Sequence, residues 1–248
     1  MREQREWVTA GTGDGLGSSG TVAAMGSETG VAVNAVRVAT TSGALTVIAE
    51  DRTDVETSGR AEVSREGSSA TITATSHRVT VRIPAGIDIV VGSMSGRVKI
   101  IGRPGAVAVV AESGKVTVEH AETADLRVRS GRVEVGTVDG TCRVRAESGR
   151  IVIRRCGDAE VTTRSGHLTI ASASGPVRAH CVSGRIDIAM AVAADVDADT
   201  VSGRIAVSLP AGASPQVVGV RHPPTIAPPF DCIVTARSVS GRVSVKVG

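Results

Sequence analysis

The segment Ser148-Gly-Arg-Ile-Val-Ile153 decides the fold, because its six-residue pattern recurs through most of the chain. The eight copies begin at Ser95, Ser113, Ser130, Ser148, Ser165, Ser183, Ser202 and Ser240. The first seven copies are nearly evenly spaced, and the last interval is twice as long as the one before it. Self-similarity at such a short period is typical of a solenoid, in which each repeat forms one coil and stacks on its neighbours.

Each copy reads as a β-strand, because side chains alternate between the two faces of a strand. The third and fifth residues after the Ser are aliphatic in all eight copies, and they predict the inward face. These sixteen residues are Val98, Ile100, Val116, Val118, Val133, Val135, Ile151, Ile153, Leu168, Ile170, Ile186, Ile188, Ile205, Val207, Val243 and Val245. A second, weaker strand is expected halfway round each coil, with residues such as Val109 and Ala236 facing the first strand.

The composition predicts a thin core. One Trp, one Phe and no Tyr accompany 41% hydrophobic residues, which are mostly Val, Ala and Ile. A globular core of this size normally uses aromatic side chains to fill its centre. We therefore expect an all-β protein whose core is only two side chains across, with a Gly at each sharp corner of the coil.

The repeat also predicts how the chain is organised. Residues 1–30 are rich in Gly, Ser and Thr and are expected to form a flexible leader. The β-solenoid is expected over 31–248, with irregular opening strands at 31–92 and regular coils at 93–248. Residues 208–228 have lost the motif and hold five of the nine prolines, so this coil is expected to bulge out as a loop.

The run from Val79 to Val91, followed by Ser95-Gly-Arg-Val-Lys-Ile100 and its repeats, resembles the adhesin-like β-strand-repeat family. This family is a widespread bacterial domain of unknown function, number 4097, and the resemblance covers about 31–248. It implies a single-stranded, right-handed parallel β-helix, in which the repeat spacing gives each coil about 17–19 residues. The family has no established reaction, so the resemblance transfers no catalytic residues.

One position of the repeat is free to carry function, namely the residue after each Ser-Gly. It is a cation at Arg97, Lys115, Arg132, Arg150, Arg185, Arg204 and Arg242, and a histidine at His167. Stacked coils would place these side chains about 4.8 Å apart in a ladder. The ladder could bind an anionic polymer, an anionic lipid or an acidic protein. Alternatively, its heads are solvated and pair with Glu112, Glu119, Glu134 and Glu147.

The remaining motifs give little indication of a cofactor or metal site. The stretch 15–20 formally matches GxGxxG, but no apolar strand precedes it and no helix pattern follows it. Asp195, Asp197 and Asp199 alternate on one side of a strand and could bind a cation, although an outward polar face explains them as well. The four cysteines lack metal-ligand spacing and are expected to be buried thiols. No cofactor or metal is therefore expected.

Catalysis by a β-helix usually requires clustered carboxylates, often with aromatic sugar platforms, and neither pattern is present. His180 and Cys181 are adjacent in a strand and should point to opposite faces. A carbohydrate-active enzyme therefore stays a low-ranking alternative. Sequence-specific nucleic-acid binding is not expected either, because aromatic residues for base stacking are missing.

The end of the chain favours assembly. A solenoid ends in an open strand that can template another chain, and the last coil, 240–248, has no capping segment after it. We expect a non-catalytic scaffold or adhesin-like protein that associates end to end, unless 208–228 or the N-terminal strands fold back as a cap. No apolar run approaches the ~20 residues of a membrane span, and no secretory hydrophobic segment is present, so a cytoplasmic location is expected.

Overall fold

The computed structural model describes residues 33–75, 77–220 and 228–248, and the regular elements in these ranges are β-strands. The short strands are β1 (Ala35–Thr40), β2 (Ala44–Glu50), β3 (Glu56–Ser58), β4 (Glu62–Glu66), β5 (Ser69–Ala74), β6 (Val79–Pro84), β7 (Asp88–Ser93), β8 (Arg97–Gly102) and β15 (Pro215–Val218). The long strands are β9 (Ala106–Ala121), β10 (Thr123–Val138), β11 (Cys142–Cys156), β12 (Ala159–Ala173), β13 (Val177–Met190), β14 (Val196–Leu209) and β16 (Cys232–Val247). The all-β parallel solenoid predicted from the repeat is confirmed.

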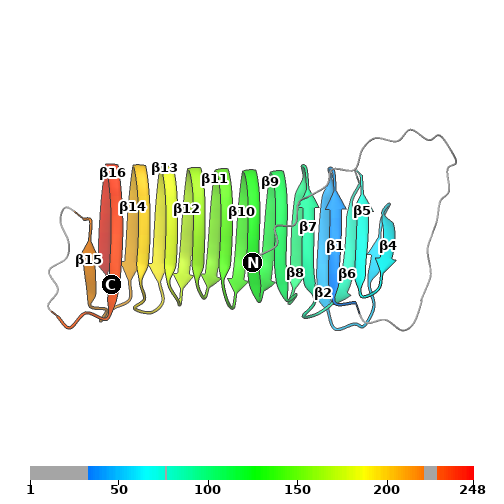
Figure 1. The fold of residues 1–248 in the computed structure, drawn as a ribbon, viewed down its shortest axis with the longest axis horizontal. Helices are drawn as coiled ribbons and strands as arrows, with labels where there is room; N and C mark the ends of the chain where they lie inside the picture. The colour runs from blue at the N-terminus through cyan, green and yellow to red at the C-terminus, as the bar shows by residue number, and fades with distance from the viewer. Residues whose placement is uncertain (1–32, 76, 221–227) are drawn as a thin grey trace, which may run out of the picture. The chain divides into compact units, whose positions relative to one another are not determined.

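Each long strand forms one coil by bending at its Ser-Gly pair. We call the residues before the Ser the first arm and the residues after the Gly the second arm. The sequence pattern predicted two separate strands per coil, but the ladder of paired residues continues through the corner, as in Ser130↔Ser148 and Gly131↔Gly149. In Figure 1 the long strands lie side by side, and the loops between them gather along the lower edge.

The two arms enclose the predicted core. Fourteen of the sixteen inward aliphatic residues are fully buried, among them Ile151 and Ile153. The facing residues of the first arms are buried as well, from Val109 to Ala236. Val243 and Val245 are the exceptions and are only partly buried, because they belong to the last coil.

The opening coils do not stack in chain order. β1 pairs in parallel with both β5 and β7, and β2 pairs in parallel with both β6 and β8. The coil formed by 35–50 therefore lies between the coil of 69–84 and the coil of 88–102. Its corner is Ser42-Gly43, which resembles the later Ser-Gly corners. Periodicity in the sequence identifies a coil but contains no information about which coil it stacks on.

The two ends of the solenoid are finished differently. At the N-terminal end, β4 pairs antiparallel with β5, and β3 pairs antiparallel with β6. At the C-terminal end, β15 pairs only with the start of β16, from Pro215↔Cys232 to Val218↔Thr235. The proline-rich segment 208–228 thus contributes one short strand to the sheet, and residues 221–227 lie outside the described residues.

Candidate functional site

The predicted cations form a ladder on the outer face of the second arms. Adjacent strands pair Arg97 with Lys115, Lys115 with Arg132, and so on through His167 to Arg204 with Arg242. Arg150, Arg204 and Arg242 are exposed. We call this set the cation ladder: Arg97, Lys115, Arg132, Arg150, His167, Arg185, Arg204 and Arg242. It brings together in one row all the residues of the ladder that the sequence suggested.

Half of the cation ladder has carboxylate partners. The Lys115 Nζ lies 2.7 Å from Glu134, and an Arg132 guanidinium nitrogen lies 3.7 Å from the same carboxyl group. The hydrogen bond from Lys115 lowers the pKa of Glu134. In the same way, Asp187 lies 2.6 Å from Arg185 and 3.6 Å from His167.

The other members of the cation ladder have no ion pair among the described residues: Arg97, Arg150, Arg204 and Arg242. Of the four glutamates suggested as their partners, only Glu134 pairs with the ladder. Glu119 instead lies 2.8 Å from Lys99, and Glu112 and Glu147 lie 2.7 and 3.9 Å from Arg129. The glutamates therefore neutralise only part of the cation ladder, because Glu112, Glu119 and Glu147 contact cations of other rows.

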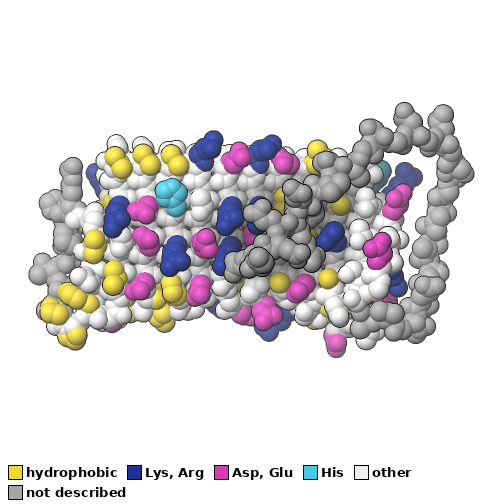
Figure 2. Space-filling model, in the orientation of Figure 1, with side chains coloured by type: hydrophobic (Ala, Val, Ile, Leu, Met, Phe, Trp, Pro, Cys, Tyr) yellow, Lys and Arg dark blue, Asp and Glu magenta, His cyan; other side chains and the backbone are white. Residues whose placement is uncertain are grey.

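Some rows on the first arms behave differently, because their charges alternate in sign from strand to strand, although Arg127 and Arg145 lie in register with like charge. One row reads Asp125, Arg143, Glu160, Arg178, Asp197 in register. The Arg143 Nε is 3.1 Å from Glu160. The face that Figure 2 shows mixes cationic and anionic side chains accordingly. Opposite charges on neighbouring strands stabilise a sheet, whereas like charges directly opposite one another destabilise it.

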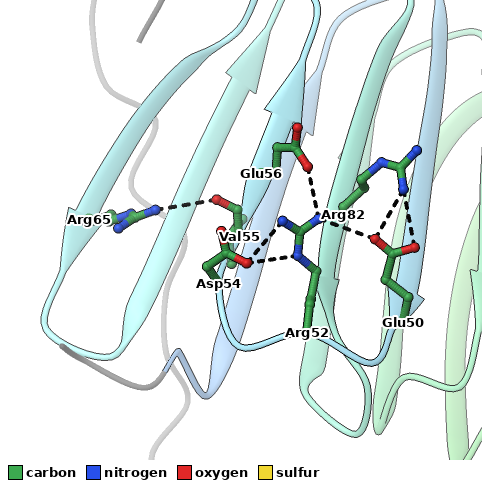
Figure 3. A network of polar contacts seen from close by, with 7 residues as sticks. All are labelled: Glu50, Arg52, Asp54, Val55, Glu56, Arg65 and Arg82. Atoms are coloured by element: carbon green, nitrogen blue, oxygen red, sulfur yellow. Dashed lines mark hydrogen bonds and ion pairs between the residues drawn. The ribbon is translucent and has the colours of Figure 1, made fainter. Parts of the chain in front are cut away.

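A network of charged residues, which the sequence did not suggest, fastens the N-terminal end (Figure 3). The Arg52 guanidinium contacts Glu50 at 3.3 Å, Asp54 at 3.0 Å and Glu56 at 3.0 Å. Arg82 on β6 contacts the same Glu50 at 3.1 Å. Since Glu56 begins β3, the network holds this antiparallel strand and its connecting loop against the sheet. The hydrogen bond from Arg52 lowers the pKa of Asp54.

The strands that close this end are themselves polar. β4 is exposed along its whole length and reads Glu-Val-Ser-Arg-Glu, and β3 reads Glu-Thr-Ser. Short, charged edge strands discourage pairing with another chain. The N-terminal end is therefore built to stop the sheet.

The C-terminal end is covered over only part of its edge. β15 lies beside Cys232–Thr235, and among the described residues no strand pairs with the second arm of β16 on the side away from β14. We call this uncovered second arm, 242–247, the open edge. Its inward residues Val243, Val245 and Val247 are only partly buried.

Exposed hydrophobic side chains also gather at the C-terminal end. Seven of the ten large hydrophobic residues that are exposed in the described ranges belong to β13–β16 or the loops beside them: Val182, Val192, Val201, Val218, Phe230, Ile233 and Val239. Figure 2 shows a hydrophobic row along the upper edge over β13, β14 and β16, which is continued toward β9 by side chains of alternating charge. This row ends at Val239, whose exposed fraction is 85%.

The remaining candidate residues show no constellation for catalysis or metal binding. The Asp195 carboxylate accepts a hydrogen bond of 2.9 Å from the Ile233 backbone N–H, so it positions β16. No group of three or more His, Cys, Asp or Glu that could hold a metal ion occurs in the described part of the chain. Cys181 is buried while His180 is exposed, so the two point to opposite faces as predicted. The GxGxxG match at 15–20 lies outside the described residues.

The cysteines are all buried and unpaired, as the sequence predicted. Burial raises the pKa of Cys142 to about 12 and the pKa values of Cys156 and Cys232 to about 11. Thiols with such pKa values are almost entirely protonated at neutral pH, and the thiolate is the nucleophilic form. The arrangement therefore does not provide an activated cysteine.

These features define the class of protein: a parallel β-solenoid in which one bent strand forms each coil, closed at one end and partly open at the other. Residues 51–218 match the model of the Toastrack family, DUF4097, and the chain belongs to this family. The resemblance noted in the sequence to an adhesin-like repeat family is thereby confirmed.

Two further comparisons add little. The comparison with curated proteins found no match. A solved structure of a proposed cell adhesion protein from Clostridium sporogenes is similar over 88% of this chain and 94% of that chain, at 8% identity and a TM-score of 0.21. A score this low supports no inference about this chain. Within the described residues, no helix is long and apolar enough to cross a membrane.

Proposed function

We propose that this protein is a non-catalytic, adhesin-like scaffold that associates with a second copy of itself through the open edge of β16. The observation that carries the proposal is the partial burial of Val243 and Val245. Their counterparts in the other seven copies of the repeat are fully buried, because each of those strands has neighbours on both sides. A strand added beside the open edge would complete the burial of both residues.

The open edge offers backbone groups as well as side chains. An uncovered strand presents a row of free N–H and C=O groups, which is a template for pairing with another chain. The open edge reads Arg-Val-Ser-Val-Lys-Val, so its two charges, Arg242 and Lys246, lie on the outward face and its inward face is apolar. Its inward positions are all valine, so it lacks the inward-pointing charge that often blocks edge pairing.

The contrast between the ends supports a closed pair rather than a filament. A head-to-tail filament would require the open edge to pair with β3 and β4, and these strands are short and charged. Pairing of the open edge with the same edge of a second copy uses one self-complementary surface and closes after two copies. The hydrophobic row of Val182, Val201 and Val239 ends on β16, where the exposed Val239 would add apolar contact beside the paired edges.

Sedimentation velocity over a concentration series tests this proposal. We expect a dimer for the unchanged chain and a monomer for Val243→Lys, because a lysine on the inward side of the edge opposes strand addition. Val110→Lys is the matched control: Val110 is an exposed valine on β9, away from both ends, and its replacement should leave the dimer intact.

A second variant, Val239→Lys, tests the interface without the risk of misfolding, because Val239 is largely exposed and its replacement should not disturb the fold. This variant should weaken the dimer while the circular dichroism spectrum stays unchanged. A monomeric unchanged chain throughout the series, or equal dimer formation by all four proteins, would overturn the proposal. Species larger than two copies would instead indicate a filament and contradict the closed pair.

A further inference from the structure

The second arms of β11 to β16 carry an excess of positive charge, which the proposed assembly does not use. These arms contain seven Arg or Lys residues and a single acid, Asp187. The cations are Arg150, Arg154, Arg155, Arg185, Arg204, Arg242 and Lys246. The first arms of the same strands contain five Arg and four acids, so their charges nearly cancel. The charge imbalance therefore belongs to one face of the solenoid.

The arrangement of these cations distinguishes them from an ordinary solvated surface. In two rows on the first arms, acids and bases alternate from strand to strand, and some of them pair, as Arg143 does with Glu160. A third row places Arg127 beside Arg145. In the cation ladder the same parallel register places Arg204 directly beside Arg242, and no acid lies next to either in its row. Like charges in register destabilise a sheet, and a bound anion would remove that repulsion.

We propose that the second-arm face of β11 to β16 binds a linear phosphate polymer that runs across the strands along the cation ladder. Parallel strands place successive ladder positions about 4.8 Å apart, so a chain laid along the ladder meets a cation at nearly every step. Six of the seven cations are arginine. The planar guanidinium group binds phosphate oxygens in a bidentate manner, which lysine cannot do.

The lack of aromatic side chains narrows the choice of polymer. Phe230 is the one aromatic residue among the described residues, and it lies outside the second arms. Single-stranded nucleic acids bind largely through stacking of bases on aromatic side chains. Sugar-binding surfaces commonly use aromatic platforms as well, so a phosphate chain without bases fits this face better than either.

Binding of fluorescently labelled linear polyphosphate, followed by anisotropy at 50 to 300 mM salt, tests the inference. The variant Arg204→Gln/Arg242→Gln removes two adjacent, unpaired ladder residues. We expect its affinity to fall about tenfold or more and the slope of log K against log salt to decrease by about two. The matched control Arg145→Gln/Arg178→Gln removes the same charge from exposed first-arm positions and should change the affinity less than twofold.

A gain-of-affinity variant makes the test independent of damage to the fold. Asp187→Asn removes the single acid of the face and frees Arg185 and His167, so binding should become tighter. An equal loss in both arginine pairs, or no binding at 50 mM salt, would overturn the inference. Tighter binding of single-stranded DNA or of an acidic polysaccharide than of polyphosphate would also overturn it. Because Val243→Lys leaves the ladder unchanged, polyphosphate binding by that variant separates this inference from the proposed assembly.

Discussion

The Cβ atom that Gly149 lacks would lie 2.0 Å from the carbonyl oxygen of Gly131, the corner glycine of the preceding coil. Gly149 also has a φ of +128°, a conformation that L side chains rarely adopt. The same close approach recurs at successive corners, so a column of glycines fills this edge of the solenoid. The corners therefore stack backbone on backbone, and the coil spacing leaves no room for a side chain.

Replacement of Gly149 by alanine should be severely destabilising. Backbone strain and the overlap with Gly131 together should lower the free energy of unfolding by on the order of 3 kcal/mol or more. Gly92→Ala is the control, because Gly92 lies within β7 and a Cβ there meets nothing within 4 Å. Urea denaturation should show a much lower midpoint for Gly149→Ala and little change for Gly92→Ala. Similar midpoints for the two variants would contradict the close stacking.

Truncation of equivalent core residues should lower the free energy of unfolding by different amounts along the solenoid. Val135→Ala removes two methyl groups from a fully buried site and should cost about 2 kcal/mol. Val245→Ala makes the same change at the equivalent place of the last coil, where the side chain is only partly buried. In a monomer its cost should be about half as large. Denaturation at low and high protein concentration measures both, and a cost for Val245→Ala that rises with concentration would accompany dimer formation.

The thiols should be unreactive in the folded protein. Burial is the main cause of the raised pKa values of Cys142, Cys156 and Cys232, so little thiolate forms at pH 8. A disulfide reagent such as DTNB should label none of the four cysteines within minutes, and all four after unfolding in urea. Rapid labelling of one cysteine in the native state would show that its coil opens, and Cys232 near the C-terminal end is the position to examine first.

The network around Arg52 should make the N-terminal end sensitive to acid. The pKa of Asp54 is lowered by its hydrogen bond with Arg52, so the carboxylate stabilises the folded end above its unfolded pKa. This contribution is lost as the pH falls below about 4. Hydrogen exchange of the β3 amides should therefore accelerate in acid.

The variant Arg52→Gln tests the same network at neutral pH. It removes contacts with three carboxylates, and protection of the β3 amides should fall about tenfold. Arg145→Gln, at an exposed position on a first arm, is the control and should leave β3 unchanged. If both variants leave the exchange of β3 unaltered, packing rather than the charge network holds the strand.

Much of this fold could be predicted from the sequence, because the relevant physics is local. The alternation of aliphatic with other residues around Ile151 and Ile153 indicates which face of the strand is buried. The regular recurrence of the Ser-Gly pair indicates the length of each coil. Even the cation ladder could be predicted, since equal spacing from each Ser-Gly places Arg204 and Arg242 in the same row. The continuous bent strand was missed, because a Ser-Gly pair marks a corner without showing whether hydrogen bonding stops there.

What only the tertiary structure decided concerns neighbours that are distant in the chain. The sequence by itself determined that 35–50 forms strands, but the structure inserted this coil between two later ones. It also closed one end with β3 and β4 and paired Glu112 and Glu147 with Arg129 instead of the ladder. Among the described residues, it left the second arm of β16 open on one side. The physical reason is that periodicity determines what each coil looks like, whereas stacking order, ion pairing and edge cover depend on which surfaces meet in space.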